Sequence, residues 1–192
     1  MKQQNPDLDV ILVPGDLVTH GLSSDKPEEA GDMYSRLTST LGAVSDLFQT
    51  YFSSVIVLPT IGNNDTEYHY NPPSGPRKKE YYQTLIKDWF TGHTANQSLP
   101  NLADIKSTVA EGGWYRVDIP GADLSVLSLN TLFYDARNWE GHTSTDQNQL
   151  DWLQSQLSGA SEGHKFIILS HIYETTSFYM GEMDNWDEDE YQ

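Results

Sequence analysis

Three short apolar runs in this chain each end at side chains that can bind a metal ion or transfer a proton. The run "VILVPGD" ends at Asp16, "VIVLPTIGNND" ends at Asn63, Asn64 and Asp65, and "KFIILSHI" leads to His171. Short apolar runs rich in branched residues and closed by Gly or Pro are typical of buried strands. Ligands of open α/β sheets bind beyond the carboxyl ends of the strands. The pattern therefore predicts that these side chains meet at one site.

Helical patterns separate the apolar runs. Apolar residues recur every three or four positions across residues 28–52, despite Gly42, and again from Tyr81 to Trp89. Residues 91–105 look like a loop with short helical turns at most. Strands that alternate with helices indicate an α/β class with a mostly parallel or mixed sheet.

The second half of the chain predicts a hairpin and a further helix. The segments "GGWYRVDI" and "LSVLSLN" read as paired strands around Pro120 and Gly121. Ser144 and Gln147 have the spacing of a capping box in front of an apolar helical stripe.

Length, charge and cysteine content limit the domain organisation, the partners and the kinds of site that this chain can have. A chain of 192 residues suits one domain, residues 1–192, with an acidic tail at 181–192 that we expect to be solvated or frayed. The net charge of −17 disfavours nucleic acid and anionic membrane surfaces as partners. The absence of cysteine excludes disulfides, thiol nucleophiles and Cys-ligated zinc.

No apolar run approaches the length of a membrane span, and no signal peptide is evident at the start. Asn64 and Asn96 match the glycosylation acceptor pattern, which often arises by chance.

The blocks "GDLVTHG", "PTIGNNDTEYHYN" and "ILSHI" resemble those of calcineurin-like metallophosphoesterases. The flanking text "GGWYRVDI", "LSVLSLNTLFYDARNW" and "QNQLDWLQSQL" is similar to the acid sphingomyelinase-like branch, which includes endopolyphosphatases. The resemblance extends from Asp9 to about Ile172. It implies a β-sandwich flanked by helices that holds two divalent metal ions, usually zinc, and a bridging water that attacks phosphorus.

Matching the motifs residue by residue assigns expected roles. Asp16 would bridge both metal ions, Asn63 would bind one through its amide oxygen, and His171 would be a further ligand. His20 would contact the phosphate or the leaving group. Asp65 would orient the ligands from behind.

Two asparagines, Asn64 and Asn130, also match family blocks. Many members of the family carry His at the position of Asn64, where it protonates the leaving oxygen; Asn can donate a hydrogen bond but is no general acid. Either His20 or His69 could supply the proton instead. The "GNND" form also occurs in endopolyphosphatase-like members. Asn130 in "SLNT" matches a block that faces the substrate.

Two family blocks have no counterpart in this sequence. The upstream Asp-any-His block and the downstream Gly-His-any-His block supply further ligands, so we expect the first and last metal-ligand strands to be missing. The complete domain would hold two ions, whereas this chain would hold part of the site or none of it. A partner chain could supply the remaining ligands. The family resemblance alone implies a secreted, lysosomal or vacuolar location.

Three functions stay open at this point. The chain is a phosphodiesterase acting on a phospholipid such as sphingomyelin, a polyphosphate-cleaving phosphohydrolase, or a non-catalytic structural module that retains the scaffold. For the individual residues a structural role competes with the functional one: Asp16 could be a turn residue and His171 a core histidine. Four other histidines lie in loop-like text and are expected at the surface: His69, His93, His142 and His164.

Overall fold

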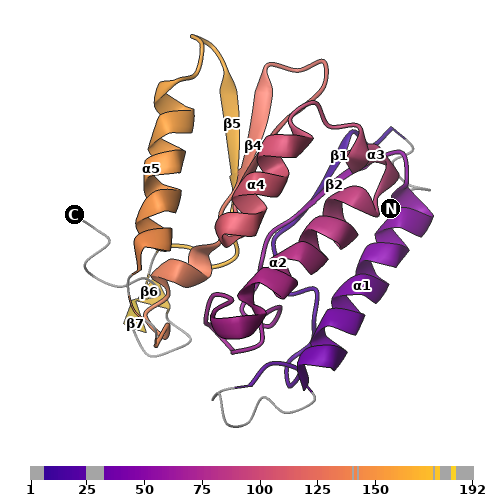
Figure 1. Ribbon diagram of the computed structural model, residues 1–192. Helices are drawn as coiled ribbons and strands as arrows, with labels where there is room; N and C mark the ends of the chain where they lie inside the picture. The colour runs from indigo at the N-terminus through magenta and orange to yellow at the C-terminus, as the bar shows by residue number, and fades with distance from the viewer. Residues whose placement is uncertain are drawn as a thin grey trace.

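The computed structural model describes residues 7–24, 33–139, 141, 143–174, 176–177 and 183–184. Most of the predicted acidic tail therefore lies outside the described residues, as do His142 and residues 28–32 of the first predicted helix. Helices and strands alternate, which confirms the α/β class (Figure 1). In the described part of the chain, no helix is both long and apolar enough to cross a membrane.

The strands form a mixed arrangement. Strand β1 (Val10–Val13) pairs in parallel with β2 (Ile56–Pro59). Strand β4 (Leu124–Ser128) pairs antiparallel with β3 (Tyr115–Asp118) and parallel with β5 (Lys165–Leu169). The turn at residues 119–123 joins β3 to β4, so the predicted hairpin is confirmed. A short antiparallel pair, β6 (Thr176–Ser177) and β7 (Met183–Asp184), follows.

One residue ties the carboxyl ends of the two larger sheets together. The backbone N–H of Thr60, just after β2, donates to Val13 O at 2.9 Å, and its hydroxyl donates to Leu129 O at 2.8 Å. Leu129 N–H in turn donates to Leu169 O at 2.9 Å. The strands β1, β2, β4 and β5 therefore end side by side, which is the condition for their trailing residues to meet.

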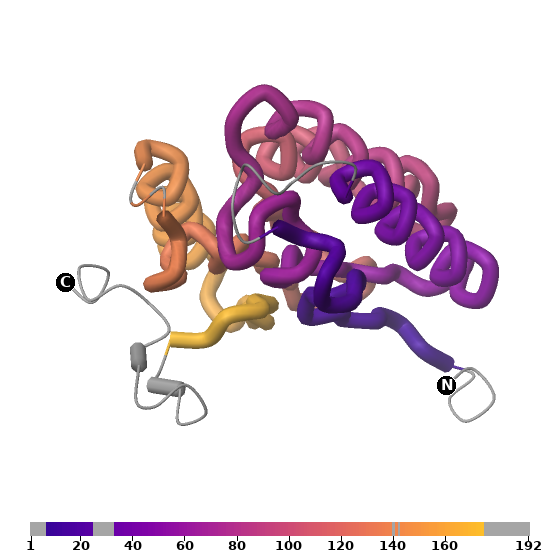
Figure 2. Tube along the Cα trace, turned by 90° about the horizontal axis from the view of Figure 1, so that it is seen from below, coloured from indigo at the N-terminus to yellow at the C-terminus, as the bar shows by residue number. Residues whose placement is uncertain are grey.

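The helices of the first two thirds pack on one side of the strands (Figure 2). They are α1 (Met33–Phe52), α2 (Lys78–Leu85) with its π-helical continuation η3 (Ile86–Thr91), α3 (Thr94–Gln97) and α4 (Leu102–Gly112). Their apolar faces and the strands bury one shared core, which includes Leu37, Leu58 and Tyr82. Because burial of apolar area drives folding, this core fixes the strands on which the site depends.

Two sequence expectations need correction in this region. Residues 91–105 were expected to be mainly loop, yet they contain α3 and the start of α4. The stripe of Leu102, Ile105 and Val109 is too short to stand out as a helix before the packing is known. His93 was expected at the surface and is instead buried, with 3% of its surface exposed.

Helix α5 (Ser144–Ser158) begins with a capping box one residue earlier than the sequence pattern indicated. Thr143 is the N-cap, and its backbone N–H donates to the Asp146 carboxylate at 2.8 Å. The predicted pair of Ser144 and Gln147 has the same spacing, so sequence alone could not choose between the two registers. Two short 3-10 turns complete the described elements, η2 (Gly75–Arg77) and η4 (Thr131–Tyr134).

Candidate metal centre

The chain turns sharply after β1 through two residues with positive φ. Gly15 has φ 86° and Asp16 has φ 55°. The left-handed region is uncommon for any residue other than glycine, although Asp tolerates it better than most. A Cβ atom at Gly62 would overlap the backbone nitrogen and Oδ1 of Asp16, so a glycine is required where the two loops meet. The turn thereby brings the Asp16 carboxylate against the loop that follows β2.

Asn64 holds the Asp16 carboxylate at both oxygens. The Asn64 backbone N–H donates to Asp16 Oδ1 at 3.1 Å, and Asn64 Nδ2 donates to Asp16 Oδ2 at 2.7 Å. Asn64 is buried, and its Oδ1 has no hydrogen-bond partner among the described residues. One third of the Asp16 side chain is exposed (33%), so the carboxylate remains accessible from the solvent side. In this structure the amide donor of Asn64 is used to fix Asp16.

Asp65 joins the same two loops from beneath. It is fully buried, and its carboxylate accepts the Val18 N–H at 2.9 Å and the Gly62 N–H at 2.8 Å. The Tyr81 hydroxyl donates to the Asp65 carbonyl at 2.7 Å. Burial raises the pKa of Asp65 to about 6, although the hydrogen bonds from Gly62 and Val18 act in the lowering direction. The Asp65 carboxylate therefore cross-links the two loops. It would support the proposed metal ligands indirectly, by holding these loops together.

His171 enters the site from the segment after β5. Its Nδ1 donates to the Pro14 carbonyl at 2.7 Å, because a carbonyl oxygen can only accept. Its Nε2 lies 2.7 Å from Asn63 Oδ1 and 3.4 Å from Asp16 Oδ1. With Nδ1 carrying the proton of the neutral ring, three lone-pair atoms converge on one point. A cation bound at this point would offset the repulsion between these lone pairs.

The three converging atoms fit a divalent ion with nitrogen and oxygen ligands. A carboxylate, an imidazole Nε2 and an amide oxygen are all donors found at such ions. The contact from His171 Nδ1 to a backbone carbonyl is the kind of support that fixes the orientation of a metal-binding imidazole. Within the described residues, no cluster of three or more His, Cys, Asp or Glu side chains could hold a metal ion. The site reaches three donors only when the amide oxygen of Asn63 is included.

Two further histidines lie beside this group. Asn63 Nδ2 lies 2.7 Å from His69 Nε2, and the exposed His20 ring packs edge-on against the His69 ring with centroids 5.9 Å apart. The structure thus brings together most of the residues expected at the site: Asp16, His20, Asn63, Asn64, Asp65 and His171. His69 had been expected at the surface or as an alternative proton donor. Its contact with Asn63 follows from the turn geometry, which the sequence pattern does not reveal.

Asn130 lies behind the site. It is fully buried, its Nδ2 donates to Gly112 O at 2.9 Å, and its Oδ1 accepts the Leu132 N–H at 3.3 Å as the N-cap of η4. These contacts connect η4 to the end of α4. The neighbouring Thr131 accepts the Ile172 N–H at 2.9 Å, so this corner supports the segment that carries His171. A role for Asn130 in substrate binding stays a prediction.

Both residues that match the glycosylation pattern have structural contacts. Asn64 holds Asp16, and the fully buried Asn96 bonds both ends of its amide to Val57, with a further hydrogen bond from its Nδ2 to Trp89 O at 2.8 Å. Neither side-chain nitrogen is accessible to a glycan in this structure.

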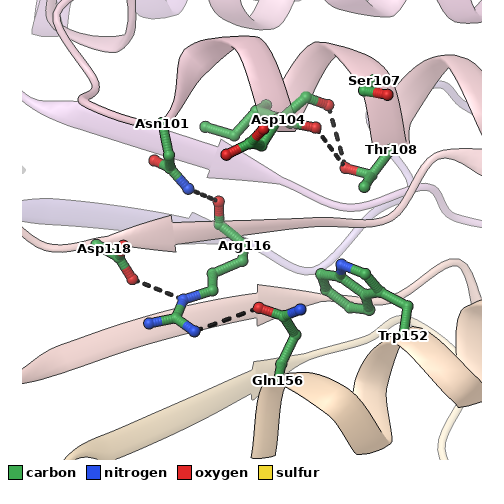
Figure 3. Close-up of a pocket in the computed structure, with 9 residues that line it drawn as sticks. Asn101, Asp104, Ser107, Thr108, Arg116, Asp118, Trp152 and Gln156 are labelled. Atoms are coloured by element: carbon green, nitrogen blue, oxygen red, sulfur yellow. Dashed lines mark hydrogen bonds and ion pairs between the residues drawn. The ribbon is translucent and has the colours of Figure 1, made fainter. Parts of the chain in front are cut away.

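A separate hollow of about 490 Å³ lies between α4, β3 and α5 (Figure 3). Arg116 is the one cationic residue in its lining. It donates to Asp118 at 2.7 Å and to Gln156 at 3.2 Å. Because its carboxylate partner already neutralises it, the hollow presents no unpaired cation to a phosphate. None of the residues expected at the site lines this hollow.

Comparisons with known proteins show which family the chain is similar to. The model of the calcineurin-like phosphoesterase family matches residues 2–191. The chain is 29% identical over 177 residues to a protein named sphingomyelinase phosphodiesterase D from Dictyostelium discoideum, with 90% of this chain and 35% of that protein covered. It is 26% identical over 175 residues to a protein named endopolyphosphatase from Neurospora crassa, with 86% of this chain and 23% of that protein covered. The chain therefore spans about a quarter to a third of the length of these relatives.

Proposed function

The chain belongs to the calcineurin-like phosphoesterase family, and from that premise we propose that it carries part of the metal centre of a phosphoric ester hydrolase. The observation that supports this most directly is the position of His171 Nε2, which lies 2.7 Å from Asn63 Oδ1 and 3.4 Å from Asp16 Oδ1, with each of the three residues beyond the end of a different strand. An apolar strand anchors each ligand in the core, so the donors are fixed before any ion arrives.

Each residue of the centre has a defined task in this proposal. Asp16, Asn63 and His171 hold a divalent ion, for which zinc is the first choice. Bound there, the ion would polarise a phosphoryl oxygen and lower the pKa of a water molecule. Asn64 keeps the Asp16 carboxylate in place, and Asp65 keeps the two loops together.

His20 is the residue best placed to meet the substrate. It is exposed and lies next to His69 at the rim of the centre, so it can contact a phosphate oxygen or the leaving group. Asn64 cannot supply a proton, and its donor group is already bonded to Asp16. We therefore assign proton donation to His20 before His69.

The proposed substrate is a phosphodiester of the sphingomyelin type. A relative named sphingomyelinase phosphodiesterase D shares 29% identity with this chain. Polyphosphate is the second candidate, because a relative named endopolyphosphatase has similar identity and the "GNND" form suits that group. A non-catalytic scaffold is the third reading.

Metal content and hydrolysis separate these functions. The purified chain is analysed for bound metal by mass spectrometry and assayed with bis-p-nitrophenyl phosphate, sphingomyelin and polyphosphate. Asp16→Asn should remove the metal and the turnover, whereas the control Glu111→Gln, at an exposed position on α4, should change neither. Metal and turnover that persist in Asp16→Asn would exclude the proposed centre. Absence of both metal and turnover in the wild-type chain would favour the scaffold reading.

A further inference from the structure

The Asn63 side chain has two chemically different ends that are close in size. Its oxygen can bind a cation, whereas its amide nitrogen can only donate hydrogen bonds and would repel one. A rotation of half a turn about the last side-chain bond exchanges the two ends. A metal site that uses this amide therefore needs a neighbour that fixes its direction.

His69 occupies the place where such a neighbour is needed. Asn63 Nδ2 lies 2.7 Å from His69 Nε2, while Asn63 Oδ1 lies 2.7 Å from His171 Nε2 on the other side. The amide nitrogen donates, so His69 Nε2 accepts. Reversing the amide would turn Oδ1 towards an acceptor nitrogen and would turn two hydrogen atoms towards the point where the ion ligands converge.

The backbone around His69 is itself anchored. The His69 N–H donates to Ser24 O at 2.9 Å, and the His69 carbonyl accepts Asn71 Nδ2 at 2.7 Å. Asn71 is buried and accepts the Trp139 N–H at 2.9 Å. The His69 ring also packs against the Tyr70 ring, with centroids 4.2 Å apart. The His69 backbone is thus held by contacts other than the one with Asn63, and the Tyr70 ring packs against the imidazole.

From this geometry we propose that His69 is a positioning residue, which directs the amide oxygen of Asn63 towards the metal ion without touching the ion itself. The proposal rests on the proposed function, because it assigns His69 a role towards the same centre. It differs from a general-acid role for His69, since it requires the ring nitrogen to accept from Asn63.

The test compares Zn²⁺ binding by three variants, measured by titration calorimetry. His69→Ala removes the acceptor and should weaken Zn²⁺ binding about 10-fold to 100-fold, the range typical for residues that orient metal ligands. His69→Gln offers Oε1 as an acceptor near the same place and should restore most of the affinity. His164→Gln is the matched control. His164 directly precedes β5 and His171 follows it, so the two histidines lie at opposite ends of the strand.

A second measurement reads the amide directly in the metal-free chain. The Asn63 side-chain NH₂ signals, identified by their loss in Asn63→Asp, should show slow hydrogen exchange in the wild type. They should exchange faster in His69→Ala and slowly again in His69→Gln.

The outcomes separate the two proposals. If the wild type takes up no Zn²⁺ but its Asn63 amide is protected by His69, the proposed function fails and the positioning contact stands. If His69→Ala leaves the amide signals and the Zn²⁺ affinity unchanged, the positioning role is wrong. A His69→Gln variant that binds Zn²⁺ as weakly as His69→Ala would also overturn it, because the imidazole would then be needed as a ligand.

Discussion

The side-chain amide of Asn64 donates a hydrogen bond of 2.7 Å to the Asp16 carboxylate, across 48 positions of sequence. The family resemblance implies a histidine at this position that acts on the substrate. Here the residue holds Asp16, the proposed metal ligand, and its backbone N–H contacts the same carboxylate at 3.1 Å. The direction of the Asp16 side chain therefore depends on Asn64.

Replacing Asn64 tests that dependence. Asn64→Ala removes one hydrogen bond and should weaken Zn²⁺ binding about 10-fold, within the range for residues that support ligands. Asn64→Asp should weaken Zn²⁺ binding further. The new carboxylate cannot donate to Asp16, and its negative charge would push the Asp16 carboxylate out of position. Calorimetric titration measures both, with Asn148→Ala on the exposed side of α5 as the control. Equal affinities in all three variants would show that Asp16 needs no support from Asn64.

Asp65 should contribute to the stability of the fold as well as to ion binding. Asp65→Asn replaces one of two acceptor oxygens by a donor that faces the N–H of Val18 or Gly62. Leaving a buried donor unpaired costs about 1–3 kcal/mol, so the free energy of unfolding should fall by that amount. Urea denaturation of Asp65→Asn and of the exposed control Glu111→Gln measures the difference. Equal midpoints for both variants would contradict the cross-linking role.

Gly62 and Gly42 should respond in opposite directions to the same substitution. Gly62→Ala places a Cβ atom on Asp16, so it should lower both stability and Zn²⁺ affinity. Gly42 lies inside α1, where an added Cβ would meet its nearest neighbour, Asp88 Oδ2, at an ordinary 3.5 Å. Gly42→Ala should therefore stabilise the chain by about 0.5–1 kcal/mol through helix propensity. Thermal unfolding of the two variants provides the comparison, and a stable Gly62→Ala chain with full Zn²⁺ affinity would contradict the close approach of the loops.

His93 should make the fold sensitive to acid. Burial lowers the pKa of His93, and neither ring nitrogen has a hydrogen-bond partner among the described residues. The unfolded chain therefore takes up a proton near pH 6.5, whereas the folded chain takes it up only at a lower pH, so this residue's contribution to stability falls as the pH falls. Above that pH its contribution is constant.

The pH effect of His93 is measured as a difference between proteins. Asp65 acts in the opposite direction, because its raised pKa of about 6 makes the folded chain bind a proton more readily as the pH falls. Urea midpoints of the wild type and of His93→Phe at pH 7.5 and pH 5.5 isolate the histidine. The wild type should lose more stability than His93→Phe between the two pH values. Parallel changes in the two proteins would assign the acid sensitivity to other groups.

The strand ends could be predicted from sequence because each depends on local information. An apolar run closed by Gly or Pro marks where β1 and β2 stop, and the residue after the stop is then a candidate ligand. The same reasoning located His171 after β5 and the turn at Pro120 between β3 and β4. These predictions needed only the position of each apolar run along the sequence and the known position of ligand sites in α/β sheets.

The direction of side chains at the site depends on packing between distant loops and could not be predicted. Asn64 faces Asp16 because Gly62 allows the loops to touch, and the Asn63 amide lies between His69 on its nitrogen side and His171 on its oxygen side. The same limit applies to α4, whose short apolar stripe becomes a helix when it packs in the shared core. Burial of His93 likewise depends on tertiary contacts.

The hydrogen bond between Pro14 and His171 closes a loop of 157 positions, almost the whole of the described chain. The entropy of loop closure makes so distant a contact slow to form, and the sheets must already be in register when it does. Uptake of an ion at this point would therefore report the last stage of folding. In a refolding experiment, the signal of metal binding should appear after the signal of helix formation. The delay between the two would measure the time that the segments of Pro14 and His171 need to come into contact.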